Sequence, residues 1–162
     1  MSTKSKIAGP GPADMLTKDY PPSFEMNFLA RLETVVQVLP AHTASLQTKL
    51  ELDCISFRIS PSNQESATIE GRASSQGGIA FRVGRGTTLE LSRSNEDRFF
   101  QICEAVFGSH FTELVIYSST GRVLYSRIQL EVEGHRVRLG GHQLFWWLFP
   151  KRRREQFVYQ PY

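Results

Sequence analysis

Residues 94–132 read SNEDRFFQICEAVFGSHFTELVIYSSTGRVLYSRIQLEV, and this stretch decides the fold. Its first half has apolar residues at helical spacing: Phe99, Ile102, Cys103, Val106 and Phe107. Ser94 is placed to cap that helix, and Gly108 is placed to end it. From residue 112 onward the period changes to two, which predicts antiparallel strands with one buried face and one solvated face.

A second helix is predicted near the beginning of the chain, over residues 23–39. Ser23 is a good N-cap residue, Glu25 lies in the first turn, and Pro40 ends the pattern. The apolar positions between them follow the helical repeat: Phe24, Phe28, Leu32, Val35, Val36 and Leu39. This helix therefore has one face to bury against a sheet.

The remaining apolar patterns predict about seven strands. They cover residues 46–59, 67–73, 79–83, 87–91, 112–117, 122–132 and 135–139. Because strands come in runs instead of alternating with helices, the predicted fold class is α+β. We expect antiparallel sheet with the two amphipathic helices, 23–39 and 94–107, packed on one face.

Composition divides the chain into three regions. Residues 1–22 hold four of the eight prolines and are expected to form a flexible N-terminal arm. Residues 23–141 are expected to form a single α+β domain, and residues 142–162 are a separate aromatic-basic C-terminal segment. The chain has no apolar run long enough for a membrane span.

Charge is distributed unevenly along the chain. The formal net charge is +3, from 19 basic and 16 acidic side chains. Residues 134–162 contain six basic side chains and one acidic one, whereas the residues before them contain 13 basic and 15 acidic. Any electrostatic function is therefore expected near the C-terminal end.

Side chains for catalysis or metal binding show no familiar spacing. The histidines, His42, His110, His135 and His142, stand apart from one another and form no zinc motif with the two cysteines. No serine lies in a Gly-x-Ser-x-Gly motif. The sequence around Gly84-Arg85-Gly86 lacks the lysine and the following helix of a phosphate-binding loop, so it predicts a hairpin turn. We expect no catalytic residue, no metal and no cofactor.

The C-terminal segment supplies the candidate site. It joins a cluster of aromatic side chains to four consecutive cations: Phe145, Trp146, Trp147, Phe149, Lys151, Arg152, Arg153 and Arg154. Three hypotheses fit this pattern. The aromatics dock into the core on a final helix or strand with the cations in water, or they bind a partner or a second copy, or the segment contacts an anionic surface.

We therefore expect a non-enzymatic cytoplasmic binding protein whose partner is a protein, in the manner of an adaptor or inhibitor, or another copy of the chain. The absence of a secretory signal pattern and the presence of only two cysteines favour the cytoplasm. The alternative is a nucleic-acid or anionic-surface binder that uses Lys151–Arg154 with Trp146 and Trp147. A second alternative is an enzyme whose site assembles from distant residues, for which Glu131 and Glu133 are a candidate carboxylate pair.

Overall fold

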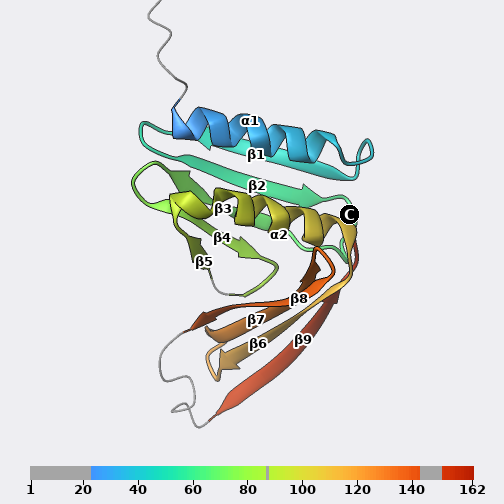
Figure 1. Cartoon of the computed structure of the whole chain (residues 1–162). Helices are drawn as coiled ribbons and strands as arrows, with labels where there is room; N and C mark the ends of the chain where they lie inside the picture. The colour runs from blue at the N-terminus through green and yellow to red at the C-terminus, as the bar shows by residue number, and fades with distance from the viewer. Residues whose placement is uncertain (1–22, 87, 143–150) are drawn as a thin grey trace, which may run out of the picture.

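A computed structural model describes residues 23–86, 88–142 and 151–162. In these ranges the chain forms two α-helices, one 3₁₀ turn and nine strands in two antiparallel sheets (Figure 1). The first sheet, sheet A, has the order β1-β2-β3-β4-β5, and the second, sheet B, has the order β8-β7-β6-β9. The α+β prediction is confirmed, with nine strands instead of about seven.

The elements of the first half are α1 (Phe24–Gln37), β1 (Ala44–Leu50), β2 (Ile55–Pro61), β3 (Ile69–Ser74), β4 (Gly78–Val83) and β5 (Leu89–Leu91). Helix α1 begins as predicted, because the Ser23 hydroxyl accepts a hydrogen bond from the amide of Met26 at 3.3 Å. The Glu25 carboxylate accepts one from the amide of Ser75 at 2.8 Å, which ties the first turn of α1 to the β3–β4 turn.

The elements of the second half are the 3₁₀ turn η1 (Arg93–Asn95), α2 (Glu96–Gly108), β6 (Phe111–Ser118), β7 (Val123–Val132), β8 (His135–His142) and β9 (Arg152–Tyr159). Ser94 was expected to cap α2, but it lies inside η1, and Asn95 occupies the cap position. The predicted apolar stripe of α2 is confirmed, since all of its members are buried.

The core lies between the helices and the inner faces of both sheets. Figure 1 shows the two helices on one face of sheet A, and sheet B lies below it. Phe28 of α1 is at the centre, with ring centroids 5.6 Å from Phe57 of β2, 5.3 Å from Phe99 and 5.4 Å from Phe100 of α2. Ile128, Leu130 and Val132 of β7 extend the same cluster into sheet B. Both sheets therefore share one apolar core.

Two regions differ from the strands predicted by the sequence, and together they account for the two additional strands. The single strand expected over residues 46–59 is a hairpin, in which β1 and β2 pair from Leu50↔Ile55 outward across the turn at residues 51–54. That turn has neither glycine nor proline, so the sequence carries no strong turn pattern there. The second region is β9, for which no strand was predicted and which pairs with β6 along its whole length.

Candidate functional site

The predicted site residues fall partly within the described chain. Phe145, Trp146, Trp147 and Phe149 lie outside the described residues, as does the expected N-terminal arm over 1–22. Lys151 precedes β9, and Arg152, Arg153 and Arg154 are its first three residues. All four cations are exposed, with β9 forming one edge of sheet B.

The position of these cations is set by anchors at the other end of β9. Tyr159 is buried and stacks on Phe111 of β6, with ring centroids 4.8 Å apart. Beyond the strand, the Tyr162 ring lies 4.7 Å from the Phe107 ring of α2, and its amide donates to the Phe107 carbonyl at 2.9 Å. The C-terminal end of the strand is thus fastened to the core, which leaves the basic end on the surface.

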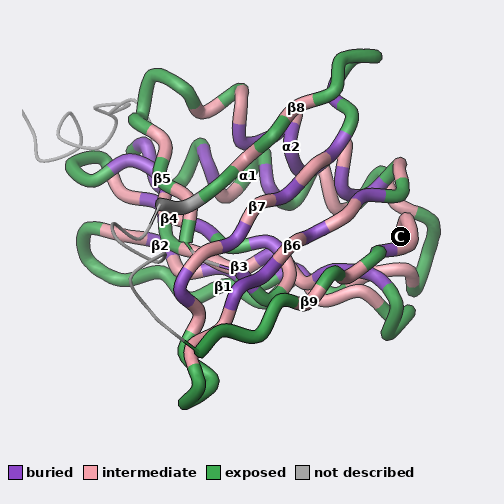
Figure 2. Tube along the Cα trace, turned by 90° about the horizontal axis from the view of Figure 1, so that it is seen from below, coloured by how far each residue is buried: buried purple, intermediate pink, exposed green. Residues whose placement is uncertain are grey.

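Pairing of β9 with β6 brings the basic end next to arginines from far away in the sequence. Residues paired across an antiparallel sheet point to the same face. The register therefore assigns five arginines to the outer face of sheet B, the face away from the helices: Arg127, Arg136, Arg138, Arg152 and Arg154. Figure 2 shows sheet B from below, with β8 and β9 along its two edges and exposed over much of their length.

This outer face carries an uncompensated positive charge. Its strand residues include one carboxylate, Glu131, which lies across from Arg136. Within the described chain, Arg127, Arg136, Arg138 and Arg154 form no salt bridge. Arg153 has the opposite orientation in β9 and pairs with Glu155 at 2.8 Å.

The centre of the outer face, between the two basic edges, is less polar. Tyr125 and Gln129 of β7 and Leu114 and Ile116 of β6 lie between them. The face thus has arginines along both edges, one arginine in the middle, and an aromatic ring with apolar groups beside it. Sequence reasoning identified the solvated side of β7 but not the arginines of β8 as its neighbours. The pattern that could have revealed them is the period of two shared by Arg136–Arg138 and Arg152–Arg154.

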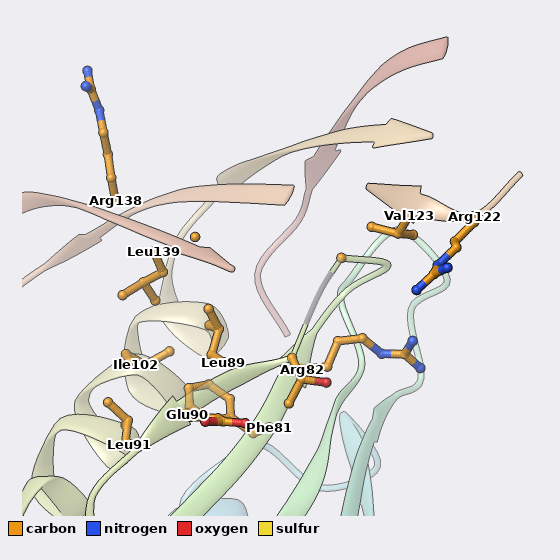
Figure 3. A pocket seen from close by; sticks show the side chains of 13 residues that line it. Phe81, Arg82, Leu89, Glu90, Leu91, Ile102, Arg122, Val123, Arg138 and Leu139 are labelled. Carbon is orange, nitrogen blue, oxygen red and sulfur yellow. The ribbon is translucent and has the colours of Figure 1, made fainter. Parts of the chain in front are cut away.

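A separate cleft of about 870 Å³ lies where the edge strands β5 and β8 approach one another (Figure 3). Its apolar end is formed by Leu89, Ile102 and Leu139. At its other end, Arg82 of sheet A and Arg122 point toward one another, whereas Arg138 points away from the cleft. The Arg138 side chain therefore belongs to the outer face, although Arg138 is also among the residues that line the cleft.

The cleft offers little for acid–base or nucleophilic chemistry. Among the described residues that line it there is a single carboxylate, Glu90, and no histidine, cysteine or serine. No three metal-ligating side chains come together in the described chain. The candidate pair Glu131 and Glu133 does not share a strand, because β7 ends at Val132 and Glu133 lies in the following turn with φ +50°. The Glu133 carboxylate accepts a hydrogen bond from the side-chain Nε2 of Gln101 at 3.1 Å.

A buried carboxylate at the junction of the two sheets was missed by the sequence analysis. Glu113 of β6 has no exposed surface, and its Oε2 accepts hydrogen bonds from the Arg85 amide at 3.0 Å and the Tyr159 hydroxyl at 2.8 Å. Gly84, with φ +71°, and Gly86 allow the β4–β5 loop to approach this closely, since a Cβ on either would lie 2.5 or 2.3 Å from a Glu113 oxygen. Glu113 therefore joins sheet B to sheet A.

Burial raises the pKa of Glu113, although the hydrogen bonds from the Arg85 amide and from Tyr159 oppose the shift. Burial, together with the charge of Glu113, also raises the pKa of Tyr159, which keeps that hydroxyl a donor. The sequence does contain one indication that Glu113 is buried. Glu113 occupies the same strand phase as Phe111 and Val115, where an apolar residue is expected.

The chain was compared with protein-family models, with curated proteins and with solved structures, and none of them matches it. Its function therefore has to be argued from its own residues. In the described part of the chain, neither helix is long and apolar enough to cross a bilayer.

Proposed function

We propose that this protein binds single-stranded nucleic acid across the outer face of sheet B. The observation that carries the proposal is the set of five arginines on one face with a single carboxylate among them. Guanidinium groups neutralise phosphates, and the release of counterions from the polyanion supplies much of the binding free energy.

The shape of the face favours a single strand over a duplex. Four strands about 4.8 Å apart span about 14 Å between the outer two, which is wider than the roughly 12 Å major groove. A single strand can instead lie across a sheet with its bases on aromatic or apolar side chains and its phosphates at the cations. Tyr125 and Leu114 lie between the arginine-bearing edges and are placed for such contacts.

Protection of the sheet edges is the competing structural explanation, because charged side chains on edge strands hinder pairing with other chains. Both β8 and β9 are edge strands. Edge protection works with either sign of charge, however, and it does not require an arginine on the central strand β7. The excess of five arginines over one carboxylate and the position of Arg127 on β7 therefore favour an anionic ligand.

A protein partner, the expectation from sequence, remains a prediction and becomes an outcome of the test. An acidic protein surface would be attracted to the same face. Arginines on both edges and in the middle of the sheet, however, are what a flexible chain of phosphates needs along its path, and an acidic protein surface does not require that distribution. We place the activity in the cytoplasm, and the two free thiols, Cys54 and Cys103, support a reducing compartment.

The test is the binding of a fluorescein-labelled, unstructured single-stranded oligonucleotide, followed by anisotropy at low salt. The variant Arg136→Gln/Arg138→Gln/Arg154→Gln removes three cations of the outer face. We expect its affinity to fall by about 100-fold, since each lost phosphate contact costs about 1 kcal/mol.

A matched control removes the same charge elsewhere. Arg31, Arg93 and Arg98 lie on the helices or the turn before α2, and their triple change to Gln lowers the net charge equally. We expect this control to lose less than about threefold in affinity. The proposal would be contradicted if the two variants lost affinity equally, or if the unchanged protein did not bind the oligonucleotide. If the protein bound an acidic protein and no oligonucleotide, the protein-partner hypothesis would be favoured.

A further inference from the structure

A small hollow of about 230 Å³ lies at one end of sheet B, where β6 ends and β9 begins. Ser118, Ser119 and Gly121 of the β6–β7 turn form one wall, and Lys151, Arg152 and Arg153 form the other. Both segments lie at the lower end of sheet B in Figure 1. The hollow therefore combines hydroxyl groups with three basic residues at one end of sheet B, where Arg152 belongs to the outer face and Arg153 to the opposite one.

The turn wall is held in place by its own hydrogen bonds. The Ser118 amide donates to the Arg122 carbonyl at 2.8 Å, and the Gly121 amide donates to the Ser118 carbonyl at 3.1 Å. The Ser118 hydroxyl accepts from the Arg122 amide at 3.1 Å and lies 2.8 Å from the Thr120 hydroxyl. A Cβ on Gly121 would meet nothing within 4 Å, so the space beside the turn is open.

The basic wall is partly pre-arranged as well. The Arg153 guanidinium is oriented by Glu155 at 2.8 Å and by the Tyr117 ring, whose centroid is 5.2 Å away. Lys151 forms no salt bridge within the described chain, and no carboxylate lines the hollow there. Cations that are already positioned lose little conformational entropy when an anion binds.

A phosphate monoester suits this hollow better than the diester of an internal nucleotide. A monoester carries a charge of about −1.5 to −2 at pH 7 and has three terminal oxygens, so it can accept from several cations and hydroxyls at once. A strand that crosses the outer face toward β9 and the β6–β7 turn would bring one of its ends to this position.

From these observations we infer that the hollow binds the terminal phosphate monoester of a nucleic-acid strand lying on sheet B. The inference rests on the proposed function and adds to it a preference for a phosphorylated end. The cations neutralise the dianion, and the Ser119 hydroxyl is available as a donor to one of its oxygens.

The test uses one single-stranded 12-mer in three forms: 5′-phosphorylated, 3′-phosphorylated, and with hydroxyl groups at both ends. We expect one phosphorylated form to bind about tenfold more tightly than the hydroxyl form, the fold-change of about one charge-assisted contact. In the Lys151→Gln and Lys151→Gln/Arg153→Gln variants this ratio should fall toward one. The single variant guards against misfolding, because Lys151 supports no salt bridge in the described chain.

The matched control is Arg136→Gln/Arg138→Gln on the opposite edge of sheet B, which should weaken all three forms alike and keep their ratio. Equal binding of the three forms by the unchanged protein would overturn the terminal-phosphate site and leave the proposed function standing. A ratio that survives the Lys151 variants would also overturn it. Failure of every form to bind would overturn both proposals.

Discussion

The Glu113 junction and the outer face of sheet B deal with charge in opposite ways. At the junction, a loop amide and a tyrosine hydroxyl surround a carboxylate that the chain itself supplies, and the group is fully buried. On the outer face, five arginines are gathered and the chain supplies one glutamate among them. At the junction, Glu113 Oε2 accepts two hydrogen bonds from the chain itself, whereas Glu113 Oε1 has no hydrogen-bond partner among the described residues. On the outer face, four of the five arginines form no salt bridge in the described chain, which leaves their charges open to a ligand.

This difference predicts that the junction contributes to stability and that the outer face contributes to binding. The Glu113 carboxylate contributes to stability by accepting from two buried donors, and its loss would leave those donors without an acceptor. Four of the five arginines form no salt bridge in the described chain, and surface charges of this kind contribute little to stability, so their concentration on one face is better explained by binding. Changes at the junction should therefore affect unfolding, and changes on the outer face should affect affinity.

The largest expected effect on stability is that of Glu113→Ala. The Arg85 amide and the Tyr159 hydroxyl would lose their acceptor inside the protein, and a cavity would remain. We expect the free energy of unfolding to fall by about 2–4 kcal/mol, measured by urea denaturation. A loss below about 0.5 kcal/mol would show that the junction does not hold the sheets together.

A smaller effect is expected from Gly84→Ala, with Gly134→Ala as its matched control. Both glycines have positive φ, +71° and +76°, and share a backbone penalty of about 1–2 kcal/mol. Only at Gly84 would the new Cβ crowd Glu113 and Tyr159, since nothing lies within 4 Å at Gly134. Gly84→Ala should therefore lower the denaturation midpoint further than Gly134→Ala, and equal midpoints would contradict a close fit at the junction.

The pH dependence of stability gives a more subtle comparison. Because the pKa of Glu113 is raised above its ordinary value of 4.5, the folded protein binds this proton more tightly than the unfolded chain does. Its contribution should make the free energy of unfolding fall as pH rises from about 4.5 to the raised pKa. Glu113→Gln should remove this component from a series of urea denaturations, and an unchanged pH profile would contradict the assignment.

The smallest effect is expected for the stability of the outer-face variant. Arg136→Gln/Arg138→Gln/Arg154→Gln breaks no salt bridge of the described chain, so the free energy of unfolding should change by less than about 0.5 kcal/mol. Thermal denaturation by circular dichroism measures this. A loss comparable to that of Glu113→Ala would mean that the arginines hold the sheet together and are not reserved for a ligand.

Periodicity predicted the elements well wherever one face is apolar and the other polar. The stripe of α2 and the alternation along β7 are both found in the structure. The β1–β2 hairpin was missed because residues 51–54 turn without glycine or proline. The apolar positions Leu46 and Leu50 also continue in phase with Cys54, so alternation alone predicts one long strand.

The candidate site was harder to predict, because it depends on which strands are neighbours. Alternation shows that Arg136 and Arg138 share a face, and that Arg152 and Arg154 share one. It does not show that β9 returns beside β6, which places both pairs on the same surface. The same holds for Glu113, whose hydrogen-bond donors are far away in the sequence: Arg85 is 28 positions before it, and Tyr159 is 46 positions after it. Local patterns carry no information about such long-range pairing.

The most direct test of the central claim is the salt dependence of oligonucleotide binding. For single strands, the slope of log K against log salt is about −0.7 for each phosphate neutralised, so five arginines predict about −3.5. The Arg136→Gln/Arg138→Gln/Arg154→Gln variant should reduce this slope by about 2, whereas the variant at Arg31, Arg93 and Arg98 should keep it. A slope near zero, or the same slope in the outer-face variant, would contradict binding of nucleic acid to this face.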